Sequence, residues 1–583
     1  ASRAVEIGSY LDIEAIVAAC VGSGAQALHP GYGFLSENPA LARACDEAGI
    51  AFVGPPAAAG ELMGDKLRAK DAARGAGVPV VPSYTEQEAR QAPAAAFPLL
   101  VKAAAGGGGR GMRVVATAGE LEAALASARR EALAGFGDDR VFVERFLPRA
   151  RHLEVQVIAD AHGNIVHLGE RECSLQRRHQ KVIEESPSPV VGDDLRAELG
   201  CQAVALARAS GYVNAGTVEF IADFHDPAEH YFLEMNARLQ VEHPVTELVC
   251  GVDLVELQLR VAAGERLPLG QDDVRLRGHA IEARITAEDP ARDFLPTAGR
   301  VLAYDRPDPA TARVDGGIEL GSVIDTAYDS LLAKLIVHGE DRAAALGRLA
   351  RALARTTILG VTTNTGYLRA LIADPAVRAG DLDTGLIERG AVAAPPMDDA
   401  GIAHAAAMLL VADRAGDDDP FARVDGWRLG GERAGSHWRM AVAGGDPVEV
   451  EVPAADVALV HRLGPGRFEI DGRGEWLLAR DGDAAWIGHN GYAWQVRPLS
   501  AATDAEAHAD GELRAPMPGQ VLLVPASVGD AVSAGDPVVV LESMKMELVL
   551  AAPIDGSVTE LTVAPGDKVA VDQPLARVEA SAS

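Results

Sequence analysis

The stretch Glu234-Met235-Asn236-Ala237-Arg238-Leu239-Gln240-Val241-Glu242 alternates polar and apolar residues without a break. Successive side chains of a β-strand point to opposite faces, so an extended segment would carry five polar side chains on one face. A merely solvated strand face would favour Lys, Thr and Ser, whereas this one offers two carboxylates, two amides and a guanidinium. The alternation predicts an extended segment over residues 234–242 with a functional polar face.

A metal site is the first function that this face indicates. Glu219, in Thr217-Val218-Glu219-Phe220, is expected on the neighbouring strand. Glu219, Glu234 and Asn236 offer hard oxygen ligands, which suit an Mg²⁺ ion that bridges the phosphates of ATP. Mn²⁺ is the expected substitute.

Two further polar patterns lie upstream. His152, Glu154 and Gln156 alternate with apolar residues, which predicts another strand with one polar face. The run Gln176-Arg177-Arg178-His179-Gln180-Lys181 is compact and basic within an acidic protein. It predicts an anion site, and a solvated basic loop is the alternative.

A glycine-rich loop joins two predicted strands, residues 98–102 and 113–115. A P-loop would need Gly-Lys-Ser/Thr at the start of a helix, and this loop has no such sequence. A glycine loop between strands can lay backbone N–H groups over phosphates and can move as a lid. Lys102 adds a point charge at its start. A flexible linker is the alternative interpretation.

These segments resemble the biotin carboxylases, which are ATP-grasp enzymes. The signature at residues 234–242 continues as His243-Pro244-Val245-Thr246-Glu247, as in that family. The string at residues 29–38, His-Pro-Gly-Tyr-Gly-Phe-Leu-Ser-Glu-Asn, closely resembles a string of the same family. The resemblance implies an α/β ATP-grasp fold with a lid at about residues 80–147.

The resemblance also implies roles for individual residues. The implied ATP contacts are Lys66, Lys102, Gly106, Gly107, Gly108, Gly109, Glu144, Leu147, His152, Gln176 and His179. The implied bicarbonate contacts are Lys181, Arg238, Gln240, Val241 and Glu242. Among these, Glu242 would be the general base, and Lys181 would contact bicarbonate and phosphate. Arg238 and Arg313 would stabilise charge on the ureido oxygen of biotin and on phosphate.

The beginning of the chain departs from the family pattern. Residues 13–20 and 41–48 read as helices and residues 25–28 as a short strand. The strand–helix–strand unit that precedes this loop in the family is mostly absent, so the N-terminal lobe is expected to be incomplete. A sheet that lacks an internal strand exposes unpaired backbone edges. Poor folding of residues 1–65 is therefore expected.

The C-terminal region contains an internal repeat. Gly519, Gly529 and Pro537 recur 37 residues later as Gly556, Gly566 and Pro574. Both halves alternate Val/Leu runs with Gly-Asp and Pro-Gly turns, which predicts a small β-sandwich with pseudo-twofold symmetry. Between them stands Met544-Lys545-Met546, with the lysine on an exposed hairpin.

This repeat resembles a biotinyl carrier domain, in which the lysine at the position of Lys545 is biotinylated. A lipoyl domain shares the fold and usually carries Asp-Lys-Ala at this point, so it is the second reading. An ordinary exposed lysine is the third.

The five tryptophans mark a separate middle domain, because all lie between residues 427 and 494. A helix at residues 398–415 precedes about eight short strand candidates, which include residues 427–429, 448–452, 467–470, 476–479 and 492–496. This order resembles the subunit-docking domain of acyl-CoA carboxylase α subunits, and an inert spacer is the alternative.

The expected domains are thus a biotin carboxylase at 1–390, divided into 1–65 and 66–390, and three parts beyond it. These are a docking domain at 391–498, a mobile linker at 499–511 and a biotinyl domain at 512–583. Extended, the linker would span at most ~43 Å.

Composition excludes several classes of function. A formal charge of −30 over 583 residues argues against nucleic acid or an anionic membrane as the main partner. Five scattered cysteines show no metal-site or disulfide spacing, which favours a reducing cytoplasm, or a mitochondrial matrix in a eukaryote.

The resemblance implies an ATP- and bicarbonate-dependent ligase that carboxylates its own biotin through carboxyphosphate. It implies biotin protein ligase and a separate carboxyltransferase β subunit as partners, in a large hetero-oligomer. Acyl-CoA would be the final acceptor, with methylcrotonyl-CoA favoured because the middle domain is short. Propionyl-, acetyl- or geranyl-CoA, another ATP-grasp ligase, and a non-catalytic biotinylated carrier or scaffold are the alternatives.

Overall fold

The computed structural model describes residues 3–104, 112–325, 328–390, 397–414, 435–499, 511–543, 546–570 and 573–580. The chain forms two compact units. The first comprises residues 1–283, 336–348 and 375–391, and the second comprises residues 284–335, 349–374 and 392–583. Two strands, β12 (His279–Thr286) and β19 (Leu331–Gly339), run from one unit into the other.

The first unit opens with a small α/β lobe. Its elements are α1 (Ile13–Ser23), β1 (Ala27–Leu28), α2 (Pro39–Glu47), β2 (Ala51–Phe52), α3 (Ala57–Gly64) and α4 (Lys66–Gly75). β1 and β2 pair in parallel, and Leu28, Leu41 and Cys45 lie in the core of this lobe. The predicted helices and the first strand are confirmed within three residues at each end.

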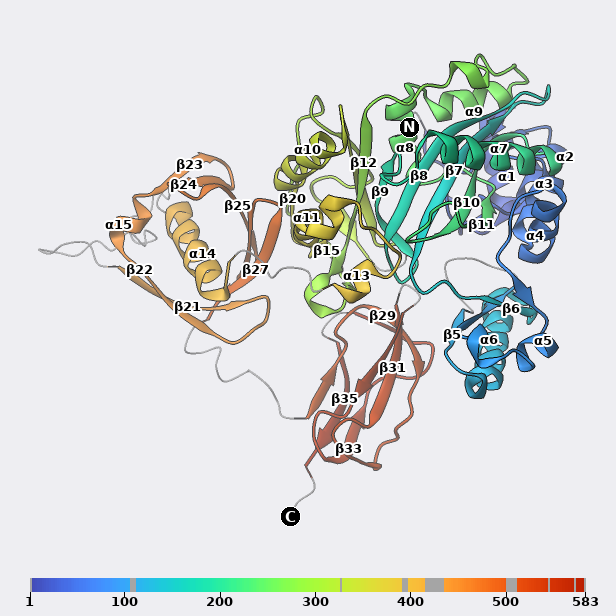
Figure 1. Ribbon diagram of the computed structural model, residues 1–583. Helices are drawn as coiled ribbons and strands as arrows, with labels where there is room; N and C mark the ends of the chain where they lie inside the picture. The colour runs from blue at the N-terminus through green and yellow to red at the C-terminus, as the bar shows by residue number, and fades with distance from the viewer. Residues whose placement is uncertain are drawn as a thin grey trace, which may run out of the picture. The chain divides into compact units, whose positions relative to one another are not determined.

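A small antiparallel sheet, in the order β3-β6-β4-β5, follows (Figure 1). Its elements are β3 (Ser83–Tyr84), α5 (Glu86–Arg90), β4 (Leu99–Ala103), β5 (Arg113–Val115), α6 (Leu121–Phe136) and β6 (Val141–Arg145). We call residues 83–145 the small subdomain. The two strands predicted to flank the glycine loop are β4 and β5, and they pair with each other.

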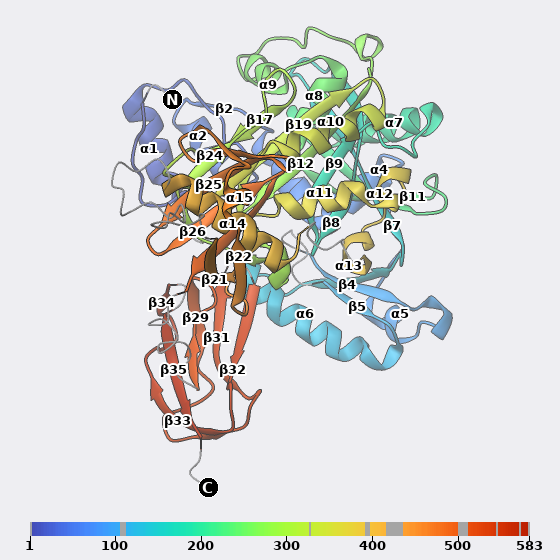
Figure 2. The ribbon, with the colours of Figure 1, turned by 90° about the vertical axis from the view of Figure 1, so that its left-hand side faces the viewer.

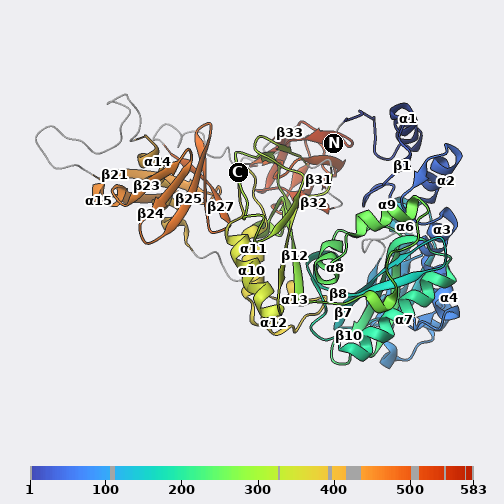
Figure 3. The same ribbon diagram turned by 90° about the horizontal axis from the view of Figure 1, so that it is seen from above.

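The main sheet of the first unit runs in the order β11-β10-β7-β8-β9-β12. Its strands are β7 (Ala150–Ala159), β8 (Ile165–Arg177), β9 (Gln180–Ser186), β10 (Asn214–Asp223) and β11 (His230–Asn236). The helices of this region are α7 (Asp193–Ala209), α8 (His243–Cys250), α9 (Leu254–Ala262), α12 (Pro375–Ala379) and α13 (Leu386–Arg389). Figure 3 shows α7 and α9 beside this sheet.

Burial explains why β7 carries polar residues in its interior. Leu153, Val155 and Val157 pack in one core with apolar residues of α3, α4 and α7. His152, Glu154 and Gln156 point to the opposite face because side chains alternate along a strand. All ten residues of β7 are buried, so this polar face is enclosed within the protein.

The second unit begins within β12, at Arg284. Its elements include β16 (Ala303–Asp305), β17 (Arg313–Gly316), β20 (Thr357–Leu359) and α11 (Thr365–Ala373). Helix α10 (Arg342–Ala354) bridges the two units along the chain. The short strands β13 (Glu288–Asp289), β14 (Leu295–Pro296), β15 (Gly299–Arg300) and β18 (Val323–Ile324) form two small antiparallel pairs, β13 with β14 and β15 with β18.

The middle region is an antiparallel sheet wrapped around α14 (Asp399–Arg414) (Figure 2). The described strands are β21 (Ser436–Val442), β22 (Val448–Val452), β23 (Val460–Gly464), β24 (Arg467–Ile470), β25 (Gly474–Asp481), β26 (Ala484–His489) and β27 (Tyr492–Pro498). Helix α14 contacts both edge strands, β22 and β23, and α15 (Ala454–Val457) connects them. The predicted helix and barrel-like sheet are confirmed, and the candidate strand at 427–429 lies outside the described residues.

The C-terminal region is the predicted β-sandwich. One sheet has the order β28-β35-β33-β30 and the other β32-β31-β29-β34. The strands are β28 (Glu512–Arg514), β29 (Gly519–Leu523), β30 (Ala531–Val532), β31 (Pro537–Ser543), β32 (Met546–Ala551), β33 (Gly556–Leu561), β34 (Lys568–Val569) and β35 (Pro574–Glu579). Ser543 pairs with Met546 across the β31–β32 hairpin. Lys545 itself lies outside the described residues.

Among the described helices, none is both long and apolar enough to cross a membrane.

Candidate active site

Three carboxylates from adjacent strands form a row across the main sheet. Glu219 of β10 is paired with Glu154 of β7 on one side and with Glu234 of β11 on the other. Directly opposed residues of an antiparallel pair share one face, so the three side chains lie on the polar face described above. Glu154 is fully buried and Glu219 is 5% exposed.

Lys181 of β9 reaches the centre of this negative charge. Its Nζ lies 2.6 Å from Glu154, 2.9 Å from Glu219 and 2.6 Å from Glu242. Burial alone would favour the neutral amine, but the three carboxylates raise the pKa of Lys181 well above its ordinary value. The three carboxylates therefore stabilise the charged form of this lysine at the centre of the site.

Glu219 accepts hydrogen bonds on both of its oxygens. Oε1 accepts from Nδ2 of Asn236 at 2.8 Å and from Nε2 of Gln240 at 3.1 Å, and Oε2 lies 3.1 Å from Nε2 of His152. Burial opposes ionisation of Glu219, but attraction to Lys181 and His152 keeps its pKa far below the usual range. Burial also opposes protonation of His152, and Glu219 outweighs it and raises the pKa of His152.

The single extended segment predicted for residues 234–242 is wrong beyond Asn236. β11 ends at Asn236, and α8 begins at His243 with Pro244 in its first turn. The chain turns between them, and Nδ1 of His243 lies 2.7 Å from the carbonyl oxygen of Gln240. A turn fits better than a continued strand because proline preorganises a helix start and the buried His243 holds the bend.

The turn still brings the predicted side chains together. Arg238 donates to the Asn236 side-chain oxygen at 3.0 Å and to the Gln240 side-chain oxygen at 2.9 Å. Its Nε also lies 3.2 Å from Glu37, whose other oxygen accepts from the Ala237 backbone at 3.0 Å. Glu37 belongs to the string at residues 29–38, so this loop reaches the site.

A cluster of lysines lies at the small subdomain. Nζ of Lys102 is 2.8 Å from Glu144, and Nζ of Lys66 is 3.6 Å from Glu234. Burial, followed by repulsion from Lys66, lowers the pKa of Lys102 to about 8, although Glu234 opposes the shift. Glu144 is fully buried and also forms an ion pair with Lys70, a residue to which the sequence analysis gave no role.

The remaining predicted nucleotide contacts differ in their placement. Leu147 and Gln176 are buried, and His179 lies in the exposed β8–β9 turn with a positive φ of 63°. Val241 lies in the turn before α8. Gly106, Gly107, Gly108 and Gly109 lie outside the described residues.

Arg313 belongs to the second unit. There its Nε is 2.8 Å from Asp315, on the same strand β17. That Arg313 and Arg238 stabilise the same developing charge remains a prediction.

The sequence analysis gave no role to three residues of the network. Glu154 was noted only for its alternation, and Glu37 only as part of a loop. Arg171 of β8 is fully buried and donates to Glu154 at 2.5 Å and to the side chain of Gln156 at 2.8 Å. The available signal was the run Glu170-Arg171-Glu172, three consecutive charged residues in the middle of the strand Ile165–Arg177.

The donor set fits a divalent magnesium ion. Carboxylates of Glu219 and Glu234 lie side by side on adjacent strands, and Asn236 provides an amide next to them. Oxygen-rich, acidic sites of this kind suit Mg²⁺ or Mn²⁺. His152, Glu154 and Glu219 also have ligand atoms within 4.8 Å of one another, so the surrounding charge favours a cation as well.

Five family models match the chain in succession. They are "Biotin carboxylase, N-terminal domain" at 1–59, "Carbamoyl-phosphate synthase L chain, ATP binding domain" at 65–269 and "Biotin carboxylase C-terminal domain" at 282–389. "Methylcrotonyl-CoA carboxylase, alpha-subunit, BT domain" matches 398–501, and "Biotin-requiring enzyme" matches 511–578.

Individual relatives match over almost the whole chain. The mitochondrial methylcrotonoyl-CoA carboxylase subunit alpha of Dictyostelium discoideum is 40% identical over 95% of this chain and 85% of its own length. The propionyl-CoA carboxylase alpha chain of Ruegeria pomeroyi is 38% identical over 99% of this chain and 94% of its own. A crystal structure of the biotin carboxylase–β,γ-ATP complex from Campylobacter jejuni is 42% identical, with a TM-score of 0.64 over 67% of this chain and 87% of that one.

The fold agrees with these matches. The chain thus contains an ATP-grasp ligase followed by a domain of the biotin-requiring type. It belongs to the α subunits of biotin-dependent acyl-CoA carboxylases.

Proposed function

We propose that this chain uses ATP and bicarbonate to carboxylate biotin attached to its own Lys545. The network of Lys181 with Glu154, Glu219 and Glu242 carries the proposal. It gathers anionic and cationic groups in one enclosed place, where a small anion such as bicarbonate can be held and deprotonated. The cofactors are ATP, Mg²⁺ and biotin.

We assign bicarbonate to Lys181, Arg238, Gln240, Val241 and Glu242. Lys181 and Arg238 supply positive charge to the anion. Glu242 is buried and accepts a hydrogen bond from Lys181, and we assign it as the base that accepts the proton of bicarbonate. Lys181 then contacts both the base and the anion.

We assign the nucleotide to Lys66, Lys102, the loop Gly106–Gly109, Glu144, Leu147, His152, Gln176 and His179. The two lysines lie near Glu144 and Glu234 and supply charge for phosphates. Glu219, Glu234 and Asn236 would hold Mg²⁺, which supplies charge neutralisation to the phosphates when bound. Arg238 and Arg313 would stabilise charge on the ureido oxygen of biotin.

The domain division of the sequence analysis remains our proposal, with residues 80–147 as a lid. The matched models support its order. We assign the middle domain at 391–498 to docking of a separate carboxyltransferase β subunit, within a large hetero-oligomer. Biotin protein ligase would attach biotin to Lys545. The compartment would be the cytoplasm, or the mitochondrial matrix in a eukaryote.

Methylcrotonyl-CoA is the acyl substrate that we propose. The matched model at 398–501 and several methylcrotonoyl-CoA carboxylase relatives support it. Propionyl-CoA is the second candidate because of the relative from Ruegeria pomeroyi.

The test is bicarbonate- and biotin-dependent ATP hydrolysis by the full chain with Mg²⁺ and free biotin. We expect turnover that Arg238→Ala abolishes, and biotinylation of Lys545 by mass spectrometry after treatment with biotin protein ligase. Turnover without bicarbonate would favour another ATP-grasp ligase. Carboxylation unaffected by Lys102→Met would favour a non-catalytic scaffold. Mixing with β subunits of defined specificity then distinguishes methylcrotonyl-CoA from propionyl-CoA.

A further inference from the structure

Lys70 is a buried lysine beside the nucleotide residues, and burial, followed by repulsion from Lys102, lowers its pKa to about 6. It lies on α4, one helical turn after Lys66, and is 2% exposed. Its Nζ pairs with Oε1 of Glu144 and lies 5.2 Å from the centre of the Phe142 ring. A helix position of this kind would ordinarily hold a leucine or methionine, because burial of a lysine is costly.

Glu144 is shared between two lysines. Oε1 pairs with Lys70, and Oε2 lies 2.8 Å from Nζ of Lys102. The carboxylate is fully buried, so water does not screen either pair. Each lysine therefore limits the hold of Glu144 on the other.

This sharing has a consequence for Lys102. With Lys70 present, Lys102 receives one oxygen of Glu144 and keeps the rest of its hydrogen-bonding capacity for another anion. Without Lys70, both carboxylate oxygens would be available to Lys102, and a nucleotide phosphate would have to compete with them.

We propose that Lys70 is a positioning residue of the nucleotide site: by engaging Glu144 it keeps the Lys102 ammonium available for ATP phosphate. The inference rests on the proposed role of Lys102. In this proposal Lys70 acts through Glu144.

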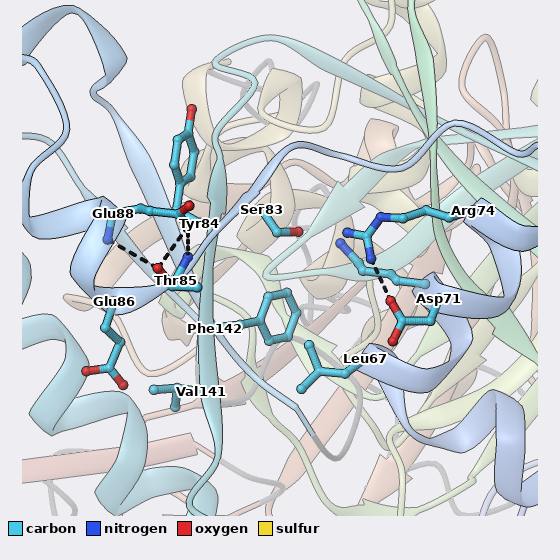
Figure 4. Close-up of a pocket in the computed structure, with 11 residues that line it drawn as sticks. Leu67, Asp71, Arg74, Ser83, Tyr84, Thr85, Glu86, Glu88, Val141 and Phe142 are labelled. Atoms are coloured by element: carbon cyan, nitrogen blue, oxygen red, sulfur yellow. Dashed lines mark hydrogen bonds and ion pairs between the residues drawn. The ribbon is translucent and has the colours of Figure 1, made fainter.

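A cavity next to Lys70 should allow the protein to fold when this residue is substituted. About 430 Å³ of space is lined by Lys70 together with Leu67, Ser83 and Phe142 (Figure 4). The hydroxyl of Ser83 also lies 3.5 Å from Glu144. A water in such a polar space can bond to Glu144 when the lysine is shortened or neutralised, so Lys70→Met is expected to fold.

The test compares steady-state kinetics of the full chain with Lys70→Met, Lys70→Arg and Arg74→Met. Arg74 is the matched control, since it lies one turn further along α4 and pairs with Asp71 at the surface. Lys70→Met should raise the KM for ATP about ten- to a hundredfold, the range for one charge-assisted hydrogen bond, with kcat nearly unchanged. Lys70→Arg should restore most of the affinity, and Arg74→Met should behave as the parent chain.

A pH profile separates positioning from a structural role. In Lys70→Met the alkaline limb of kcat/KM for ATP should move to higher pH, because Glu144 then pairs with Lys102 alone and Lys102 keeps its proton longer. A lower melting temperature with unchanged KM and an unmoved limb would overturn the inference. Lys102→Met serves as the reference: if it leaves KM and kcat intact, the proposed nucleotide site fails, and if it impairs them while Lys70→Met does not, only the positioning role fails.

Discussion

The substitution Glu154→Gln isolates the charge at the centre of the buried network. Glu154 is fully buried and bonded to Arg171 at 2.5 Å and to Lys181 at 2.6 Å. Lys181 keeps two other carboxylates after the substitution. Arg171 would still donate to the side chains of Gln156, Thr217 and Thr246, which are all neutral.

The expected magnitude follows from that loss. Removing one partner of a buried ion pair costs about 3–5 kcal/mol, because the other charge stays buried without compensation. The amide oxygen of glutamine can still accept one hydrogen bond, which favours the lower end, about 3 kcal/mol. At about 2–4 °C per kcal/mol for a large domain, the melting temperature of the first unit should fall by about 6–12 °C.

The chain provides its own spectroscopic control. Trp438, Trp476, Trp486 and Trp494, the tryptophans within the described residues, lie in the second unit, so their fluorescence reports the unfolding of that unit. Calorimetry should show the transition of the first unit moving down while the tryptophan transition stays in place. Asp71→Asn, which removes a surface pair with Arg74, should change the calorimetric transition by less than about 0.5 kcal/mol. If Glu154→Gln shifts it no further than that control does, the buried-charge reasoning is refuted.

Three further predictions concern other parts of the chain. Because the pKa of Lys102 is lowered to about 8, its positive charge is lost as pH rises through that value. Initial rates measured from pH 7 to 9.5 should therefore show that the KM for ATP rises above pH 8, and a KM that does not change with pH would contradict this. Burial raises the pKa of Glu172 to about 7, so the stability that its neutral form provides is complete below about pH 4.3 and lost as pH rises through 7. Melting temperatures of the parent chain should therefore fall by the equivalent of a few kcal/mol between pH 5 and 8, and Glu172→Gln should reduce that slope. Gly491→Ala should destabilise the second unit by about 1–3 kcal/mol more than Gly482→Ala. Both glycines have a positive φ, but only at Gly491 would an added Cβ lie 2.4 Å from a backbone oxygen. Equal melting temperatures of the two variants, detected by tryptophan fluorescence, would argue against this.

Local patterns predicted the strands of the site well. The alternation at residues 152–157 and the Glu219 segment became β7 and β10, because one apolar face of each packs in a core with helices. The middle domain was also predictable, since Gly- and Asp-rich turns separate its strands. Helix α14 is apolar on nearly all sides because the sheet wraps around it.

The partners within the site could not be read from local patterns. Glu37 meets Arg238 across about 200 residues of chain, and Arg171 meets Glu154 through the register of β7 and β8. Register between strands depends on packing of the whole sheet and leaves no local trace. The break after Asn236 was missed for a related reason: the polar alternation of residues 236–242 fits a strand, but the buried turn before α8 decides the backbone path.

The connection of the small subdomain has a consequence for protein engineering. The chain enters it after Pro82 and leaves it at Arg145, and the Arg145 amide donates to the Pro82 carbonyl at 3.0 Å. Entry and exit are therefore neighbours, so residues 83–145 form an insertion whose two ends meet at a single point. Residues 83–145 can therefore be exchanged between related enzymes as one module that joins the host at a single place. The exchange would transfer the glycine loop and Lys102 together.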